Sequence, residues 1–146
     1  MATAAQESGY RAPDVVRIVG VTYRQLDYWA RTDLITPSIQ DAHGSGSQRL
    51  YGFRDLVLLR SIKDLLDTGV SLQKVRIALD YLREHLGEEP EGMTLVSDGE
   101  NIFACNSDSE VIDVLKQGQG SMFMLPVAKV WTELERSLTG KAKTGS

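Results

Sequence analysis

The sequence predicts an α+β protein, with four helices and a short hairpin in its first part and a small ββαβα segment in its second part. Three observations indicate this class. Apolar residues recur at helical spacing up to residue 86, and glycine or proline separates the expected elements. After residue 92 the chain changes to short runs that are typical of strands, joined by turns and helices.

The composition is that of an ordinary globular protein. Of the 146 residues, 42% are hydrophobic and 25% are charged, which fits one domain or two small ones and argues against disorder. No apolar run approaches the ~20 residues of a membrane span, and residues 1–8 lack the pattern of a signal peptide. The single cysteine, Cys105, can form neither an intrachain disulfide nor a thiolate metal cluster. These features predict a cytoplasmic protein that does not bind membranes.

Charge is distributed unevenly along the chain. The net charge of −4 by itself argues against nucleic-acid binding. Residues 1–76, however, carry ten Lys or Arg against eight Asp or Glu, whereas residues 77–146 carry six against twelve. This distribution is compatible with a DNA-binding first part and an acidic second part. The placement of the basic residues, more than the net charge, therefore decides whether DNA binding is indicated.

Two helices are expected in quick succession near the N-terminus. The first begins at Pro13, a residue favoured in the first turn, and ends at Gly20. Thr22 and Gln25 have the spacing of a capping box, and they open a second helix that runs to about Thr32. This second helix is rich in polar and aromatic residues.

A hairpin and two longer helices follow. Proline and glycine make residues 37–48 a loop, and the extended run 49–51 after it predicts a hairpin, that is, a wing. The third helix is expected over residues 53–68 and the fourth over residues 71–86. In the fourth helix, Leu72, Val75, Leu79, Leu82 and Leu86 follow one another at alternating spacings of three and four, and we interpret this apolar seam as ordinary core.

The second part is expected to contain strands over residues 93–96, 101–105 and 121–125 and helices over residues 107–116 and 126–138. We therefore predict a flexible tail over residues 1–9, a first domain over residues 10–87 and a linker over residues 88–91. A small second domain over residues 92–139 and a second tail over residues 140–146 follow.

The first two helices and the tight glycine-containing turn between them have the arrangement of a helix-turn-helix. The N-terminal residues of its second helix face base edges in the major groove. Arg24 can donate two hydrogen bonds to guanine and Gln25 can pair with adenine, but the capping box would turn Gln25 back to the backbone, so Arg24 ranks first. We expect Tyr23, Tyr28 and Arg31 to contact phosphate or sugar.

Several segments resemble the MerR family of transcriptional regulators. Residues 21–31 are similar to the family's recognition segment, which typically has a valine, a serine or threonine, two variable residues, an aliphatic residue, an arginine, two aromatics and then a basic residue. Residues 49–51 with Asp55 and Leu56 resemble its wing exit, and residues 69–72 resemble the entry to its fourth helix.

This resemblance covers the first domain and implies a winged helix-turn-helix that binds double-stranded promoter DNA. The residues expected to contact DNA lie in the second helix and around the wing, and they are Thr22, Tyr23, Arg24, Gln25, Tyr28, Arg31, Ser47, Arg49 and Tyr51. Two residues depart from the family pattern. Asp27 replaces the usual arginine, so we expect it to accept a bond from a nearby arginine or to read a cytosine amine. Asp33 replaces the usual glycine, which can alter the helix end.

The leading hypothesis is a sequence-specific transcriptional regulator that acts at the nucleoid without a metal or cofactor. The long dimerisation helix of the family is replaced after Gly87 by a segment that is small for an independent core. We therefore expect this second domain to form a homodimer that binds an inverted repeat. The resemblance further implies distortion of the promoter and RNA polymerase as a partner.

Two alternatives stay open. One is an architectural, excisionase-like protein that bends DNA, against which the second domain argues mildly. The other is a ligand-sensing or protein-interaction module with a degenerate helix-turn-helix, which the acidic second half would suit. An enzyme is not indicated, because His43 and His85 are isolated and no catalytic triad presents itself.

Overall fold

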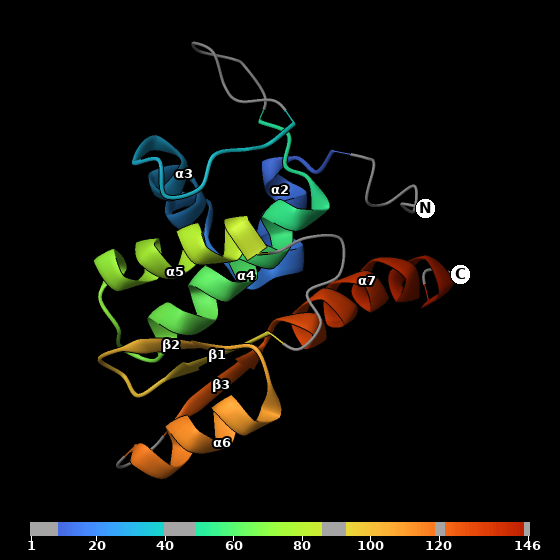
Figure 1. Ribbon diagram of the computed structural model, residues 1–146. Coiled ribbons are helices and arrows are strands. Elements are labelled where there is room, and N and C mark those ends of the chain that lie inside the picture. Colours follow the sequence, from blue (N-terminus) through green and yellow to red (C-terminus); the bar gives the residue numbers. More distant parts are fainter. Residues whose placement is uncertain (1–8, 40–48, 86–92, 119–121, 145–146) are drawn as a thin grey trace. The chain divides into compact units, whose positions relative to one another are not determined.

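The computed structural model describes residues 9–39, 49–85, 93–118 and 122–144 (Figure 1). The elements along these residues are α2 (Ala12–Val15), η1 (Val16–Gly20), α3 (Tyr23–Arg31), α4 (Phe53–Asp67), α5 (Leu72–His85), β1 (Thr94–Ser97), β2 (Ile102–Cys105), α6 (Asp108–Gln117), β3 (Phe123–Pro126) and α7 (Val127–Thr144). Helices combined with an antiparallel sheet confirm the predicted α+β class. Among the described residues, no helix is both long and apolar enough to cross a membrane.

The chain folds into two compact units. The first comprises Met1–Arg60 and Leu134–Ser146, and the second comprises Ser61–Glu133. The division falls within α4 and α7 and differs from the boundary at residues 88–91 expected from the sequence. That boundary stays a prediction for the domains as units of folding and function.

In the first unit, the first helix changes its hydrogen-bonding pattern halfway. It begins with Pro13 in its first turn, and from Val16 onward it is a π-helix that ends at Gly20. Gly20 has a φ of 87°, a left-handed conformation that glycine adopts without steric cost. The following Val21 is extended, so the chain turns directly into the Thr22 cap of α3.

Helix α3 begins and ends with recognisable caps. The predicted capping box is present, with Thr22 Oγ1 accepting from Gln25 N at 3.0 Å and Gln25 Oε1 accepting from Thr22 N at 2.9 Å. At the other end, Leu34 N donates to Trp29 O and Asp33 N donates to Ala30 O, which is the hydrogen-bond pattern of a Schellman motif. Asp33 has a φ of 60° there, which explains physically why glycine suits this position.

Backbone conformation at Asp33 gives a stability prediction. Replacing Asp33 with valine should lower the free energy of unfolding by about 1–2 kcal/mol relative to the Asp33→Gly variant, because a β-branched residue is strained in the left-handed region. Both variants lack the carboxylate, so their difference reports the backbone alone. Urea unfolding followed by circular dichroism measures it. Equal stability of the two variants would contradict the strained geometry.

The segment that leads into α4 is held by backbone pairing. Tyr10 and Tyr51 form an isolated antiparallel bridge with bonds of 2.8 and 2.9 Å. Ile39 N donates to Leu50 O at 3.2 Å, so the chain on the two sides of residues 40–48 is paired. The rest of the expected hairpin lies outside the described residues.

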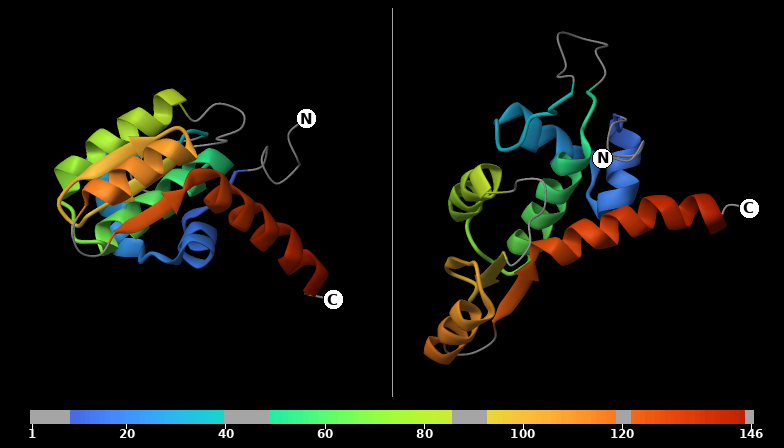
Figure 2. Two further views of the ribbon diagram at one scale, coloured as in Figure 1. Left: turned by 60° about the horizontal axis from the view of Figure 1, so that its bottom comes forward. Right: turned by 45° about the vertical axis from the view of Figure 1, so that its right-hand side comes forward.

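The second unit is built around a three-stranded antiparallel sheet. Its order is β2-β1-β3, with Val96 opposite both Phe103 and Met124. Helix α5 lies on one face of the sheet and α6 on the other (Figures 1 and 2). Val75, Leu79 and Leu82 of α5 are fully buried, which confirms that the described part of the apolar seam is core.

Candidate nucleic-acid interface

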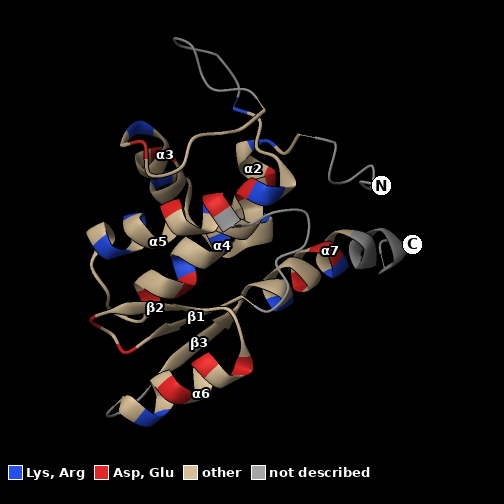
Figure 3. Cartoon of the chain, viewed as in Figure 1, with Lys and Arg blue, Asp and Glu red and all other residues tan. Residues whose placement is uncertain are grey.

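Helix α3 has one buried side and one polar side. Leu26, Trp29 and Ala30 face inward and are buried. The exposed residues include six of the side chains that the sequence predicted to contact DNA, namely Thr22, Tyr23, Arg24, Gln25, Tyr28 and Arg31. Figure 3 shows basic and acidic residues together on this helix. The amphipathic pattern therefore brings the predicted recognition residues onto the surface of one short helix.

Arg24 and Gln25 are not equivalent on this surface. Gln25 Oε1 accepts hydrogen bonds from the Thr22 backbone N–H and, at 3.3 Å, from the Thr22 hydroxyl. A bidentate pairing with adenine needs both the oxygen and the amide nitrogen of a glutamine. Gln25 retains only its amide nitrogen as an uncommitted donor in this geometry, whereas Arg24 is exposed in the first turn of α3.

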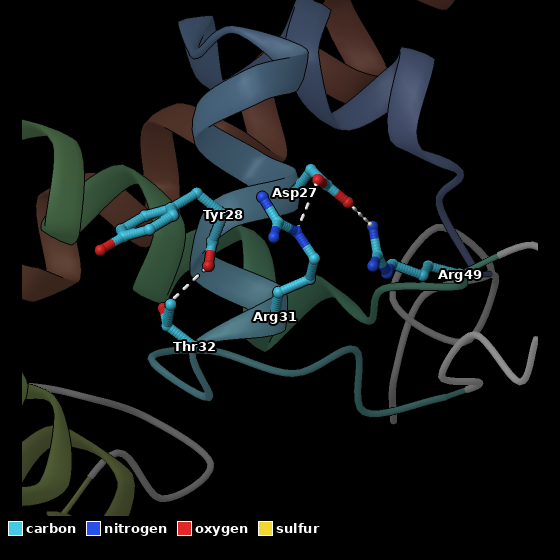
Figure 4. Close-up of polar contacts among 5 residues, drawn as sticks. All are labelled: Asp27, Tyr28, Arg31, Thr32 and Arg49. Atoms are coloured by element: carbon cyan, nitrogen blue, oxygen red, sulfur yellow. Dashed lines mark hydrogen bonds and ion pairs between the residues drawn. The ribbon is translucent and has the colours of Figure 1, made fainter.

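The carboxylate of Asp27 joins two arginines. Asp27 Oδ2 accepts from Arg31 Nε at 2.9 Å, and Asp27 Oδ1 accepts from Arg49 Nη1 at 2.9 Å (Figure 4). Arg31 is one turn further along α3, but Arg49 lies 22 residues away and follows residues 40–48. The sequence offered two roles for Asp27, and the structure shows the one in which the carboxylate accepts bonds from arginine.

This arrangement shifts the proton affinities of the groups involved. The hydrogen bonds from Arg49 and then Arg31 lower the pKa of Asp27 below its ordinary value. Burial lowers the pKa of Arg49, but the hydrogen bond with Asp27 and nearby charges outweigh burial and raise that pKa overall. Because the pKa of Asp27 is lower in the folded state, its carboxylate is ionised at neutral pH, and the stabilisation that it contributes is lost only when the pH falls through that lowered pKa.

Tyr28 lies on a different side of α3 from Asp27 (Figure 4). Its side chain is 47% exposed, and its ring points away from the Asp27–Arg49 pair (Figure 4). The backbone oxygen of Tyr28 accepts from Thr32 Oγ1 at 2.8 Å, so the last turn of the helix is held by a side chain. Tyr23, at the start of the helix, is 60% exposed.

The residues around the predicted wing differ in how exposed they are. The side chain of Arg49 is 17% exposed and lies next to α3 through Asp27. The side chain of Tyr51 is fully buried, so the structure does not bring it to the exposed surface with the others. Ser47 and His43 lie outside the described residues.

Sequence reasoning assigned no structural role to Asp55. Its Oδ2 accepts from Ser38 N at 2.9 Å, from Ser38 Oγ at 2.7 Å and from Gly52 N at 2.8 Å. One carboxylate oxygen thus binds Ser38 before residues 40–48 and Gly52 after them. Asp55 is the third residue of α4 and lies three positions after Gly52, the residue that precedes the helix. This spacing is typical of capping and could have indicated the bond to Gly52 from the sequence.

Other chemistries find little support in the described residues. The described part of the chain contains no cluster of three or more His, Cys, Asp or Glu that could hold a metal ion. Cys105 is buried at the end of β2, where burial and then the nearby Glu110 raise the pKa of its thiol. A thiol with a raised pKa is a poor nucleophile at neutral pH.

A helix-turn-helix whose second helix exposes arginines and tyrosines defines a DNA-binding protein of the helix-turn-helix class. Residues 10–82, half of the chain, match the MerR HTH family of regulatory proteins. The chain belongs to this family, as the recognition segment and wing exit predicted. This family is one of regulatory proteins.

Two groups of known proteins are similar to the chain. It is 51% identical over 126 residues to uncharacterized HTH-type transcriptional regulators of Mycobacterium bovis and Mycobacterium tuberculosis. The match covers 86% of this chain but 56% of each relative, so the chain spans little more than half of their length. The crystal structure of a MerR-family transcriptional regulator from Bacillus cereus is 19% identical and has a TM-score of 0.40, covering 91% of this chain and 98% of that chain.

Proposed function

We propose that the chain recognises specific promoter DNA through α3 and regulates transcription there. The observation that carries this proposal is the exposed Arg24 in the first turn of α3, on a helix whose other exposed residues are suited to phosphate and sugar. Arg24 would donate to a guanine edge. Tyr23, Tyr28, Arg31 and Arg49 would contact the backbone and set the register of the helix in the groove.

The winged helix-turn-helix would act in pairs. We assign the ββαβα segment to dimerisation, because it takes the place of the family's long dimerisation helix and because none of the described residues of α6 is fully buried. Ile112 of α6, Phe103 and Met124 are exposed apolar residues of this segment. A dimer would bind an inverted repeat at the nucleoid, distort the promoter and act together with RNA polymerase.

One experiment tests recognition and pairing together. Random DNA is incubated with the full chain at low salt, and bound sequences are selected over several rounds. The affinity of the protein for the selected sequences is then measured between about 50 and 200 mM salt. We expect an inverted repeat with guanine at fixed positions and a steep loss of affinity as salt rises. A single half-site would contradict the dimer. No binding at low salt would contradict DNA recognition and favour a sensing module with a degenerate helix-turn-helix.

A further inference from the structure

The side of α3 that we propose to face DNA carries an acidic residue, Asp27, where a DNA-binding helix would be expected to carry a basic residue. An acid at this place repels phosphate, and for a helix that only needed affinity it would be a disadvantage. Its two ion pairs indicate another use. We propose that Asp27 is a specificity-determining residue that restrains Arg31 and Arg49, so that they reach phosphates only when α3 is seated in the major groove.

The geometry of the pairs supports restraint and not simple neutralisation. Each carboxylate oxygen of Asp27 accepts one bond of 2.9 Å from a different arginine. Arg31 uses Nε and Arg49 uses Nη1, and a guanidinium has five N–H donors, so both arginines keep donors for a phosphate. The arginines therefore remain able to bind DNA, but from one fixed position beside α3.

The two arginines differ in how exposed they are beside Asp27. The side chain of Arg31 is 64% exposed and that of Arg49 is 17% exposed. Released from Asp27, the long side chain of Arg31 could follow a phosphate of any DNA that touches the protein. Arg49, which comes from beyond residues 40–48, would no longer be tied to the helix that reads the bases.

The restraint on the two arginines affects the complex with random DNA and the complex with the operator differently. On random DNA, α3 lies over the backbone without seated base contacts, and loosely held arginines would strengthen this binding. On the operator, Arg31 and Arg49 already face phosphates. Asp27 therefore weakens binding to random DNA more than binding to the operator. This inference rests on the proposed function, since it requires that α3 binds DNA.

The test compares Asp27→Asn with the unchanged chain on the selected operator and on random DNA, at several salt concentrations. For Asp27→Asn, we expect affinity for random DNA to rise about 5–10-fold, the salt dependence to steepen by about one ion, and the operator-to-random ratio to fall about fivefold. Asp27→Glu keeps the charge and should retain the ratio within about twofold.

Asp14→Asn is the matched control, because Asp14 also pairs with an arginine, Arg17, at 2.9 Å but lies on α2. It changes the net charge equally and should leave the ratio unchanged. An unchanged ratio in Asp27→Asn, or equal weakening on both DNAs, overturns the inference and leaves DNA recognition intact. Absence of binding by the unchanged chain overturns the proposed function, and this inference with it.

The restraint also has a readout without DNA. In the free protein, the Nε–H of Arg31 should give a slowly exchanging NMR signal, because it is bonded to Asp27. That signal should be lost in Asp27→Asn and kept in Asp14→Asn. A signal unaffected by Asp27→Asn would show that the ion pair does not hold the arginine in solution, which also overturns the inference.

Discussion

Replacing Asp55 with alanine is expected to lower the free energy of unfolding by about 2–4 kcal/mol. The carboxylate is buried, and one of its oxygens accepts three hydrogen bonds from Ser38 and Gly52. Alanine would leave the buried N–H of Gly52 without its acceptor, which costs more than losing an exposed bond. Denaturant unfolding followed by circular dichroism gives the value.

Ser38→Ala is the control for this change. It removes one of the three bonds, the one from the hydroxyl, and keeps both backbone donors on Asp55. We expect a loss of about 1 kcal/mol for this variant. If Asp55→Ala were no less stable than Ser38→Ala, then Asp55 would not hold together the two sides of residues 40–48.

Replacing Arg24 with alanine should remove sequence preference at defined base positions of the operator. A bidentate contact to guanine contributes about 1–3 kcal/mol of discrimination, so binding to the operator should weaken about 5- to 150-fold. Binding to random DNA should change much less, because it depends mainly on phosphates. The measurement is a repeat of the selection from random DNA with the variant, followed by affinities for the original operator.

Arg49→Ala separates base reading from phosphate binding. It should weaken all selected sequences about equally and reduce the salt dependence by about one ion, while the preferred sequence stays the same. The assignment of base reading to Arg24 fails if Arg24→Ala selects an unchanged sequence. The assignment of Arg49 to phosphate fails if its loss alters the preferred bases.

The Asp55 prediction and the proposal for Asp27 depend on contacts that join distant parts of the chain, and the sequence did not predict these contacts. Asp55 pairs with Ser38 over 17 residues, and Asp27 pairs with Arg49 over 22. Hydrophobic periodicity and capping signals act within one element, and they carry no information about which side chains meet across a loop. The sequence therefore indicated an arginine partner for Asp27 without identifying it.

Tyr51 is a residue for which the sequence predicted a contact that the structure does not support. A tyrosine beside a wing is equally suited to phosphate contact and to packing, and the family resemblance implied contact with DNA. In the folded chain its backbone pairs with Tyr10 and its side chain is fully buried. The packing of distant segments around Tyr51 decides such a case, and no local sequence pattern contains that information.

The sequence by itself determined the features that depend on neighbouring residues. The Thr22–Gln25 cap, the buried side of α3, the stop at Gly20 and the family follow from spacing and residue type, because caps and amphipathic faces are local. The tertiary structure alone decided the sheet order β2-β1-β3, the Asp27 pairs and the three bonds of Asp55. These features depend on which distant segments are brought together when apolar surface is buried, and that is a property of the whole fold.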